Sequence, residues 1–174
     1  MKSGRPEEGE YATYAKSDID FVAGDDAVAA LREQERVVVD YFESFTNESA
    51  NGFTYAPGKW TLKEVLGHLI DDERIFAYRA LCVARGDATP LPGFDENIYV
   101  DGANFESRLL ADLLAEYRSV RQASITLFDS LTPEAWMRTG SVNEYPASVR
   151  GLAFHVAGHE LHHLRTLNER YVRK

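Results

Sequence analysis

Apolar residues recur at intervals of three and four along four long stretches of the chain, the spacing that forms one apolar face of an α-helix. The first stretch runs from about Asp25 to Ser44, with Asp25 as the predicted N-cap. The third spans about Glu106 to Ser130, and the last runs from Ser148 to about Tyr171. Each of these stretches predicts one long helix.

The second stretch has the clearest start signal in the sequence. Thr61 and Glu64 form the pattern T-x-x-E, in which the two side chains bind each other's backbone N–H groups at a helix N-terminus. The apolar pattern then continues to Gly86, a residue typical of the position just beyond a helix C-terminus. A helix is therefore predicted between these residues.

The connections between the helices differ in length and composition. Residues 87–105 are rich in Pro, Gly, Asp and Asn and predict a long extended connection, which in a small domain is either functional or packed by its own aromatic residues. Thr132-Pro133-Glu134 predicts a short extra helix through Met137. No stretch predicts a convincing strand, so the expected fold class is all-α, a four-helix bundle.

Composition narrows the classes of partner. The chain has 174 residues, which predicts a single domain over 1–174, with 1–20 as a partly ordered N-terminal extension. A net charge of -9 and the absence of any basic stripe argue against binding to nucleic acid or to an anionic membrane. No apolar run is long enough to span a bilayer, and the polar N-terminus does not resemble a secretory signal. The single cysteine, Cys82, is expected to be a buried apolar residue and fits a cytoplasmic location.

The five histidines are the candidate functional residues. His68 lies on the second predicted helix, and His155, His159, His162 and His163 lie on the last. At about 100° per residue these four occupy one sector about 100° wide, which points at least partly into the bundle. A buried imidazole needs a polar partner, and a divalent metal ion can supply it, although ordinary hydrogen bonds can satisfy any single histidine. His155 and His163 are separated by roughly 12 Å of helix rise, so they should not both bind one ion.

His159, Glu160 and His163 also form H-E-x-x-H, the two-histidine motif of zinc proteases. In a protease the third ligand follows downstream, but the residues after His163 include only one carboxylate, Glu169, and no His, Asp or Cys. The sequence also lacks the strand that would align a peptide, so a protease is not favoured. Glu160 could reach a neighbouring group from outside the ligand set, but a solvent-facing position is favoured.

The combination of W-x7-H on the second helix with H-x3-H on the last resembles the DinB-like superfamily. The resemblance implies an antiparallel four-helix bundle with a long crossover connection, three metal ligands at His68, His159 and His163, and a homodimer. His155 and His162 match no ligand position and become candidates for supporting contacts, for substrate contact or for packing. The residues that carry the resemblance are WTLKEVLGHLIDDERIFAYRALCVARGDATPLPGFDENIYV, LLADLLAEYRSVRQAS and GLAFHVAGHELHHLRTLNERY.

The function implied by this resemblance is that of a metal-dependent enzyme acting on a small molecule, either a hydrolase or a transferase of low-molecular-weight thiols. Zinc or nickel is the expected metal, with iron or manganese as alternatives, because imidazoles discriminate poorly among these ions. Asp71 and Asp72 are candidates to orient a ligand imidazole, although a surface position is favoured for at least one of them. Asp72, four residues after His68, lies on nearly the same face. Arg79 and Arg85, on the same helix, could bind an anionic substrate group, but ordinary surface pairing is favoured.

Two alternatives to an enzyme stay open. The metal could simply tie two helices together in a non-catalytic interaction module, or the site could hold no metal. An open coordination position is typical of a catalytic zinc site, whereas a fourth protein ligand, such as His162 or Asp72, would indicate a structural one.

Overall fold

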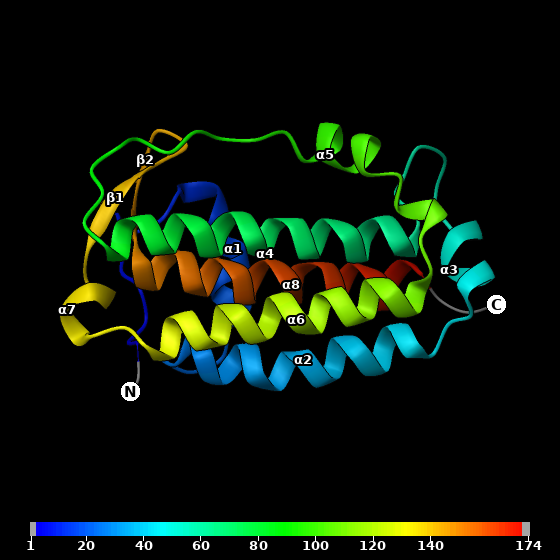
Figure 1. Cartoon of the computed structure of the whole chain (residues 1–174), viewed down its shortest axis with the longest axis horizontal. Coiled ribbons are helices and arrows are strands. Elements are labelled where there is room, and N and C mark those ends of the chain that lie inside the picture. The colour runs from blue at the N-terminus through cyan, green and yellow to red at the C-terminus, as the bar shows by residue number, and fades with distance from the viewer. Residues whose placement is uncertain (1–2, 172–174) are drawn as a thin grey trace.

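In the computed structural model, which describes residues 3–171, the four long helices form a bundle (Figure 1). Helices α2 and α4 each pack against both α6 and α8, so α2 and α4 lie diagonally across the bundle. The predicted four-helix bundle is therefore confirmed, with helix ends that differ from the prediction by one to four residues. The four helices are α2 (Ala27–Glu43), α4 (Leu62–Ala84), α6 (Leu110–Asp129) and α8 (Val149–Arg170).

Side-chain caps explain where the helices begin. The predicted T-x-x-E box precedes α4, with the Thr61 side chain accepting from Glu64 N and the Glu64 carboxylate accepting from Thr61 N. Asp26 caps α2 in place of the predicted Asp25. Gly86 has the positive φ, 80°, that suits a residue just beyond a helix end.

The long crossover is confirmed, but it is not simply extended. Helices α4 and α6 run in the same direction in Figure 1, so the chain between them must return along the bundle. This crossover contains α5 (Glu96–Ala103), capped by the Asp95 side chain, and the 3-10 turn η2 (Phe105–Ser107). The turn follows Asn104, whose φ of 50° breaks the helical path, and α6 therefore begins at Leu110 and not near Glu106. The shorter link from α2 to α4 carries α3 (Asn47–Gly52).

The expectation of no strand is wrong. After the predicted short helix, which is α7 (Pro133–Trp136), strands β1 (Thr139–Val142) and β2 (Tyr145–Ser148) form an antiparallel hairpin. Its two turn residues, Asn143 and Glu144, have positive φ values of 50° and 68°, which match the twist of a tight hairpin. The crossover joins this hairpin, since Leu91 N donates to Ser141 O and Leu91 O accepts from Asn143 N.

The N-terminal segment packs along α8. It contains the 3-10 turn η1 (Thr13–Ala15) and α1 (Lys16–Phe21), and Arg5 donates to the backbone oxygens of Ile19 and Val22. Close approach of α1 to α8 depends on Gly158, because a Cβ there would lie 2.3 Å from Asp18 O. This glycine directly precedes His159, so α1 lies beside the histidine-bearing part of α8.

Apolar side chains fill most of the interior in two clusters, and Cys82, predicted to be buried, is partly buried against one of them. Between residues 3 and 171, no helix is both long and apolar enough to cross a membrane. Several polar residues are nevertheless buried with the core. Among them are His68, Asp72, Glu73, Arg121, His155 and Glu160.

Candidate metal centre

Three imidazoles meet between α4 and α8. His68 Nε2 and His163 Nε2 each lie 3.1 Å from His159 Nε2, and the three ligand nitrogens lie within 4.8 Å of one another. His159 and His163 are one turn apart on α8, so their rings share one face of that helix. The structure therefore brings together the three residues that the family resemblance named, and we call them the histidine triad.

The glycine before His68 makes room for the end of the crossover on one side of α4. A Cβ at Gly67 would lie 2.4 Å from the Phe105 ring, so only glycine lets the end of the crossover pack directly on α4 at this point. The Trp60 ring closes another side, with its centroid 4.8 Å from that of His68. His68 is consequently only 5% exposed.

Asp72 orients the central imidazole of the triad. Its Oδ2 lies 3.2 Å from Nδ1 of His159, so Nδ1–H donates to the carboxylate and Nε2 keeps its lone pair facing the other two rings. Burial alone would raise the pKa of Asp72, but His159 and then His155 lower that pKa well below its usual range. Burial alone would lower the pKa of His159, and the Asp72 carboxylate raises it overall.

The two outer imidazoles are held neutral. Burial, and then the proximity of His159, lowers the pKa of His68 to about 4. The same causes hold the pKa of His163 well below its usual range. Neutral imidazole is the form that binds a metal, so near pH 7 these nitrogens need no deprotonation before they coordinate.

The other two histidines have separate environments. His155 is buried and stacks on Phe76 with ring centroids 3.8 Å apart, and its Nε2 lies 3.9 Å from Asp72 Oδ2. Burial lowers the pKa of His155 to about 4. His162 is half exposed and its Nδ1 lies 3.1 Å from Asp18 Oδ1, on the surface beside α1. His155 thus borders His159, with ring centroids 5.6 Å apart, and His162 borders His163, with ring centroids 5.4 Å apart, but His162 is paired with Asp18.

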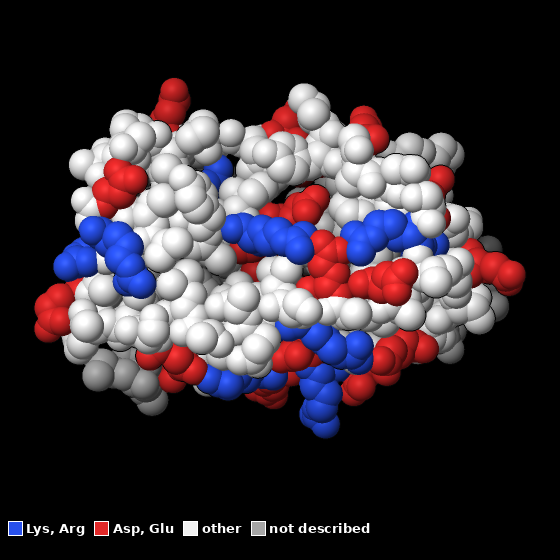
Figure 2. Space-filling model, in the orientation of Figure 1, with Lys and Arg blue, Asp and Glu red and all other residues white. Residues whose placement is uncertain are grey.

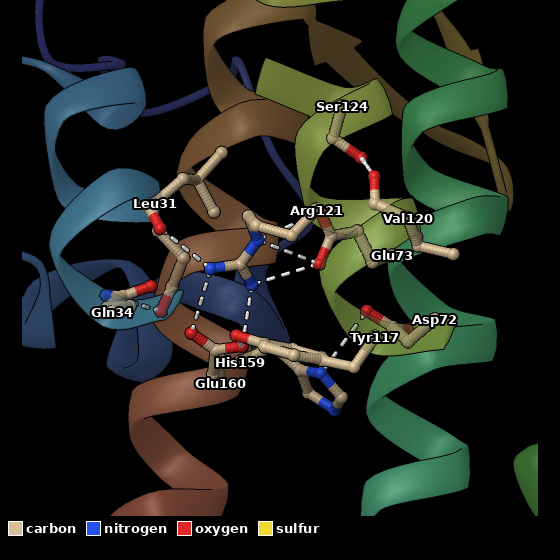
Figure 3. A network of polar contacts seen from close by, with 11 residues as sticks. Leu31, Gln34, Asp72, Glu73, Tyr117, Val120, Arg121, Ser124, His159 and Glu160 are labelled. Carbon is tan, nitrogen blue, oxygen red and sulfur yellow. Dashed lines mark hydrogen bonds and ion pairs between the residues drawn. The ribbon is translucent and has the colours of Figure 1, made fainter. Parts of the chain in front are cut away.

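Glu160 lies in a buried polar network on the other side of α8, and the favoured solvent-facing position is wrong (Figure 3). Arg121 Nη2 donates to Glu160 Oε2 at 2.6 Å, and Arg121 Nε donates to both Glu73 oxygens at 3.0 Å. Tyr117 OH donates to Glu160 at 2.7 Å, and Arg121 Nη1 donates to Leu31 O at 2.9 Å. The glutamate of H-E-x-x-H therefore points away from the triad and cannot serve as the base of a zinc protease.

A pocket of about 390 Å³ opens onto the triad. Figure 2 shows a hollow in this face of the molecule between the crossover and the body of the bundle. A second pocket of about 240 Å³ shares Trp60 and His163 with the first. Around the triad, the first pocket is lined by residues that include Tyr14, Asp18, Arg79, Phe94, Glu96 and Asn143.

The sequence did not single out most of these pocket residues. Tyr14 and Asp18 belong to the segment predicted as a partly ordered extension, and Asn143 belongs to the missed hairpin. Arg79 was expected to pair on the surface, but it is 4% exposed and its guanidinium lies over the rings of Phe76 and Phe94. No local pattern marks these residues, because contacts between distant segments place them in the pocket.

The donor set fits a divalent transition-metal ion. Bonds of 2.0–2.1 Å to a tetrahedral zinc ion separate two imidazole nitrogens by about 3.3 Å, close to the 3.1 Å that separates His159 Nε2 from each of the other two. Converging imidazole lone pairs are also poor partners for one another. Asp72 binds Nδ1 of His159, the ring nitrogen that points away from the other two imidazoles. His162 is paired with Asp18. Neither Asp72 nor His162 therefore completes the coordination sphere.

Comparisons with known proteins agree with this architecture. The structure is similar to that of YfiT from Bacillus subtilis, described as "a probable metal-dependent hydrolase with an unusual four-helix bundle topology", with a TM-score of 0.74 and 17% sequence identity over 94% of this chain and 89% of that chain. No curated protein matches the sequence. The sequence model of the DinB superfamily matches residues 25–167, which include α2, α4, α6, most of α8 and the triad. The chain belongs to the DinB superfamily.

Proposed function

We propose that this protein is a metal-dependent enzyme of the hydrolase type, which holds a divalent ion on His68, His159 and His163. The observation that carries the proposal is the convergence of three ring nitrogens at a pocket of about 390 Å³, without a fourth ligand from Asp72 or His162. Catalytic zinc sites keep one position open, whereas structural sites are closed by four protein ligands. The non-catalytic alternative is therefore less well supported than an enzyme, and a pocket of this size suits a small molecule.

Each part of the site has a physical role in this proposal. An ion held by three neutral imidazoles retains its full charge and supplies Lewis-acid activation of water and of a carbonyl group. Asp72 fixes the tautomer and the ring orientation of His159. Trp60 covers one side of His68 and limits the access of water from that direction.

Asp18 is the pocket carboxylate that we assign to proton transfer. It lines the pocket, is not bound to a triad imidazole, and pairs with His162, which is half exposed. A proton taken up by Asp18 can pass to the paired His162 imidazole and then to solvent.

Thiol transfer is the second candidate function. It is favoured by the second pocket, about 240 Å³, which meets the first at Trp60 and His163 and so offers separate room for a second substrate. Zinc or nickel is the proposed ion. Zinc suits thiol chemistry because it is a borderline-soft ion that binds thiolate well.

Metal content is the first test. Tag-free protein is to be analysed by inductively coupled plasma mass spectrometry as wild type, His68→Ala and His162→Ala, since His162 lies on α8 beside the triad but is paired with Asp18. Wild type and His162→Ala are expected to retain about one ion per chain, and His68→Ala to lose it. Metal retained without His68 would contradict the proposed ligand set.

The loaded protein is then to be screened for hydrolysis of small esters and amides and for thiol transfer. Turnover that disappears in His68→Ala supports an enzyme, and turnover that falls in His162→Ala while the ion is retained supports the proton path through Asp18. Stoichiometric metal without turnover in any screen would instead support the non-catalytic module.

A further inference from the structure

Arg79 is a buried cation in the wall of the triad pocket. It is 4% exposed, and the structure gives its side chain one hydrogen bond, from Nη2 to Pro92 O at 2.6 Å. No carboxylate of residues 3–171 lies within ion-pair distance of it, whereas the other fully buried arginine, Arg121, binds two. A buried guanidinium has five N–H donors, so this environment leaves donor capacity facing the pocket.

The guanidinium is held in place by contacts that include no ion pair. Its central carbon lies 4.7 Å from the Phe76 ring centroid and 5.5 Å from that of Phe94. Pro92 O fixes one edge, and Pro92 follows Leu91, which is paired with the hairpin. The cation is thus preorganised by α4 and the crossover, and an anion that enters the pocket could pair with it directly.

Helix geometry relates Arg79 to the triad. His68, Asp72, Phe76 and Arg79 lie on one face of α4, and three turns, about 16 Å, separate His68 from Arg79. Side chains of a helix lean toward its N-terminus, so the long Arg79 side chain extends back toward His68. The remaining gap between the guanidinium and the triad is roughly 10–12 Å, the length of a small extended molecule.

We propose that Arg79 binds the carboxylate of a small monoanionic substrate, whose far end carries the group that reacts at the triad. The inference rests on the proposed function and specifies the substrate class of that site. Arginine matches a carboxylate with two parallel N–H···O bonds. A doubly charged phosphate suits the pocket less well, because Asp18, Asp72 and Glu96 also line it and a single arginine would face two negative charges.

The test measures binding to cobalt-loaded protein, so it does not depend on turnover. The probes are 6-mercaptohexanoate and 6-mercaptohexanol, which share a thiol and a chain length and differ in the terminal carboxylate. Thiolate binding to cobalt is followed by the sulfur-to-cobalt absorption band in the near ultraviolet. The wild type is expected to bind the carboxylate at least 10-fold more tightly than the alcohol, and to show no such preference for 3-mercaptopropionate over 3-mercaptopropanol, which are too short to reach Arg79.

Substitutions assign the preference to one residue. Arg79→Gln is expected to abolish the preference while leaving the affinity for 6-mercaptohexanol within about 2-fold, and Arg79→Lys to keep part of it. Arg85→Gln is the matched control, since Arg85 is an exposed arginine at the end of the same helix, and it should behave as wild type.

The possible failures are distinguishable. If the wild type takes up no cobalt, the proposed function fails and this inference falls with it. If cobalt and both thiols bind without preference for the long carboxylate, or if Arg79→Gln keeps the preference, the carboxylate site is wrong and the metal site stands. Should Arg79→Gln not fold, the comparison of long and short thiols on the wild type still decides.

Discussion

Asp72 and Asp71 are adjacent carboxylates on α4 with different partners. Asp72 is 4% exposed and accepts from His159, whereas Asp71 is half-buried and lies 3.7 Å from the exposed Arg74. Only Asp72 can therefore raise the basicity of a triad imidazole and fix its orientation. The pair offers a natural comparison between a supporting carboxylate and a surface one.

Asp72→Asn is expected to weaken metal binding by 10- to 100-fold, the usual cost of losing a carboxylate that orients a ligand histidine. The amide loses the negative charge and can present N–H to His159, which favours the wrong tautomer. Affinity is to be measured by competition with a chromophoric chelator at pH 7.5. Asp71→Asn is the control and should change the affinity by less than about 2-fold. Equal losses of affinity in both variants would show that the effect comes from removing a negative charge near the site, and not from losing the contact with His159.

At the residue scale, sequence predicted the identity of the triad but not its surroundings. His68, His159 and His163 could be named because the family motif marks them. Glu160 could not be placed from the sequence. A helical wheel gives the angle between Glu160 and His159, but it does not reveal that Arg121 of α6 packs against the face of α8 that carries Glu160. Arg79 was misjudged for the same reason, because the rings that cover it come partly from the crossover.

At the scale of elements, Arg121 links all four long helices. It lies on α6, binds Glu73 of α4 and Glu160 of α8, and donates to Leu31 O of α2. Glu73 directly follows Asp72, and Glu160 directly follows His159, so the network also fixes the register of the two helices that carry the triad. Neither carboxylate could stay buried and charged without this guanidinium.

Arg121→Met is expected to lower the free energy of unfolding by about 3–5 kcal/mol, because two buried carboxylates lose their cation. Urea denaturation at pH 7 measures the change. Arg118→Met, one turn earlier on α6, removes only an exposed pair with Glu43 and should cost less than about 1 kcal/mol.

A triple variant separates lost charge compensation from lost packing. Arg121→Met combined with Glu73→Leu and Glu160→Leu should recover much of the lost stability, since apolar residues can replace a buried ionic group without net cost. Failure of the triple variant to recover any stability would indicate that the shape of the network matters more than its charge.

Elements marked by signals between residues close in the sequence could be predicted, and elements without such signals could not. The box at Thr61 and Glu64 and the cap at Thr132 involve residues three apart, and both appear as predicted. The hairpin was missed because its turn is Asn143-Glu144, not the Asn-Gly pair that usually marks such a turn. Helix α5 was missed because Pro and Gly around it outweigh the cap at Asp95.

At the scale of the whole molecule, the triad joins segments that are far apart in the sequence. His68 is on α4, His159 and His163 are on α8, and these helices are connected only through the crossover, α6 and the hairpin. A site in which all three residues bind one ion would exist only in the folded chain. Binding should therefore stabilise the entire bundle, not one helix.

Removal of metal is accordingly expected to lower the melting temperature. At a free metal concentration of 100 times Kd, binding to the native state alone contributes about 2.7 kcal/mol, which for a chain of this size corresponds to roughly 5–10 °C. Differential scanning calorimetry before and after dialysis against EDTA, and again after zinc is restored, measures the shift. His68→Ala should show no shift with either treatment, while His162→Ala should follow the wild type. A wild type that melts at the same temperature with and without bound metal would mean that the ion does not hold α4 to α8.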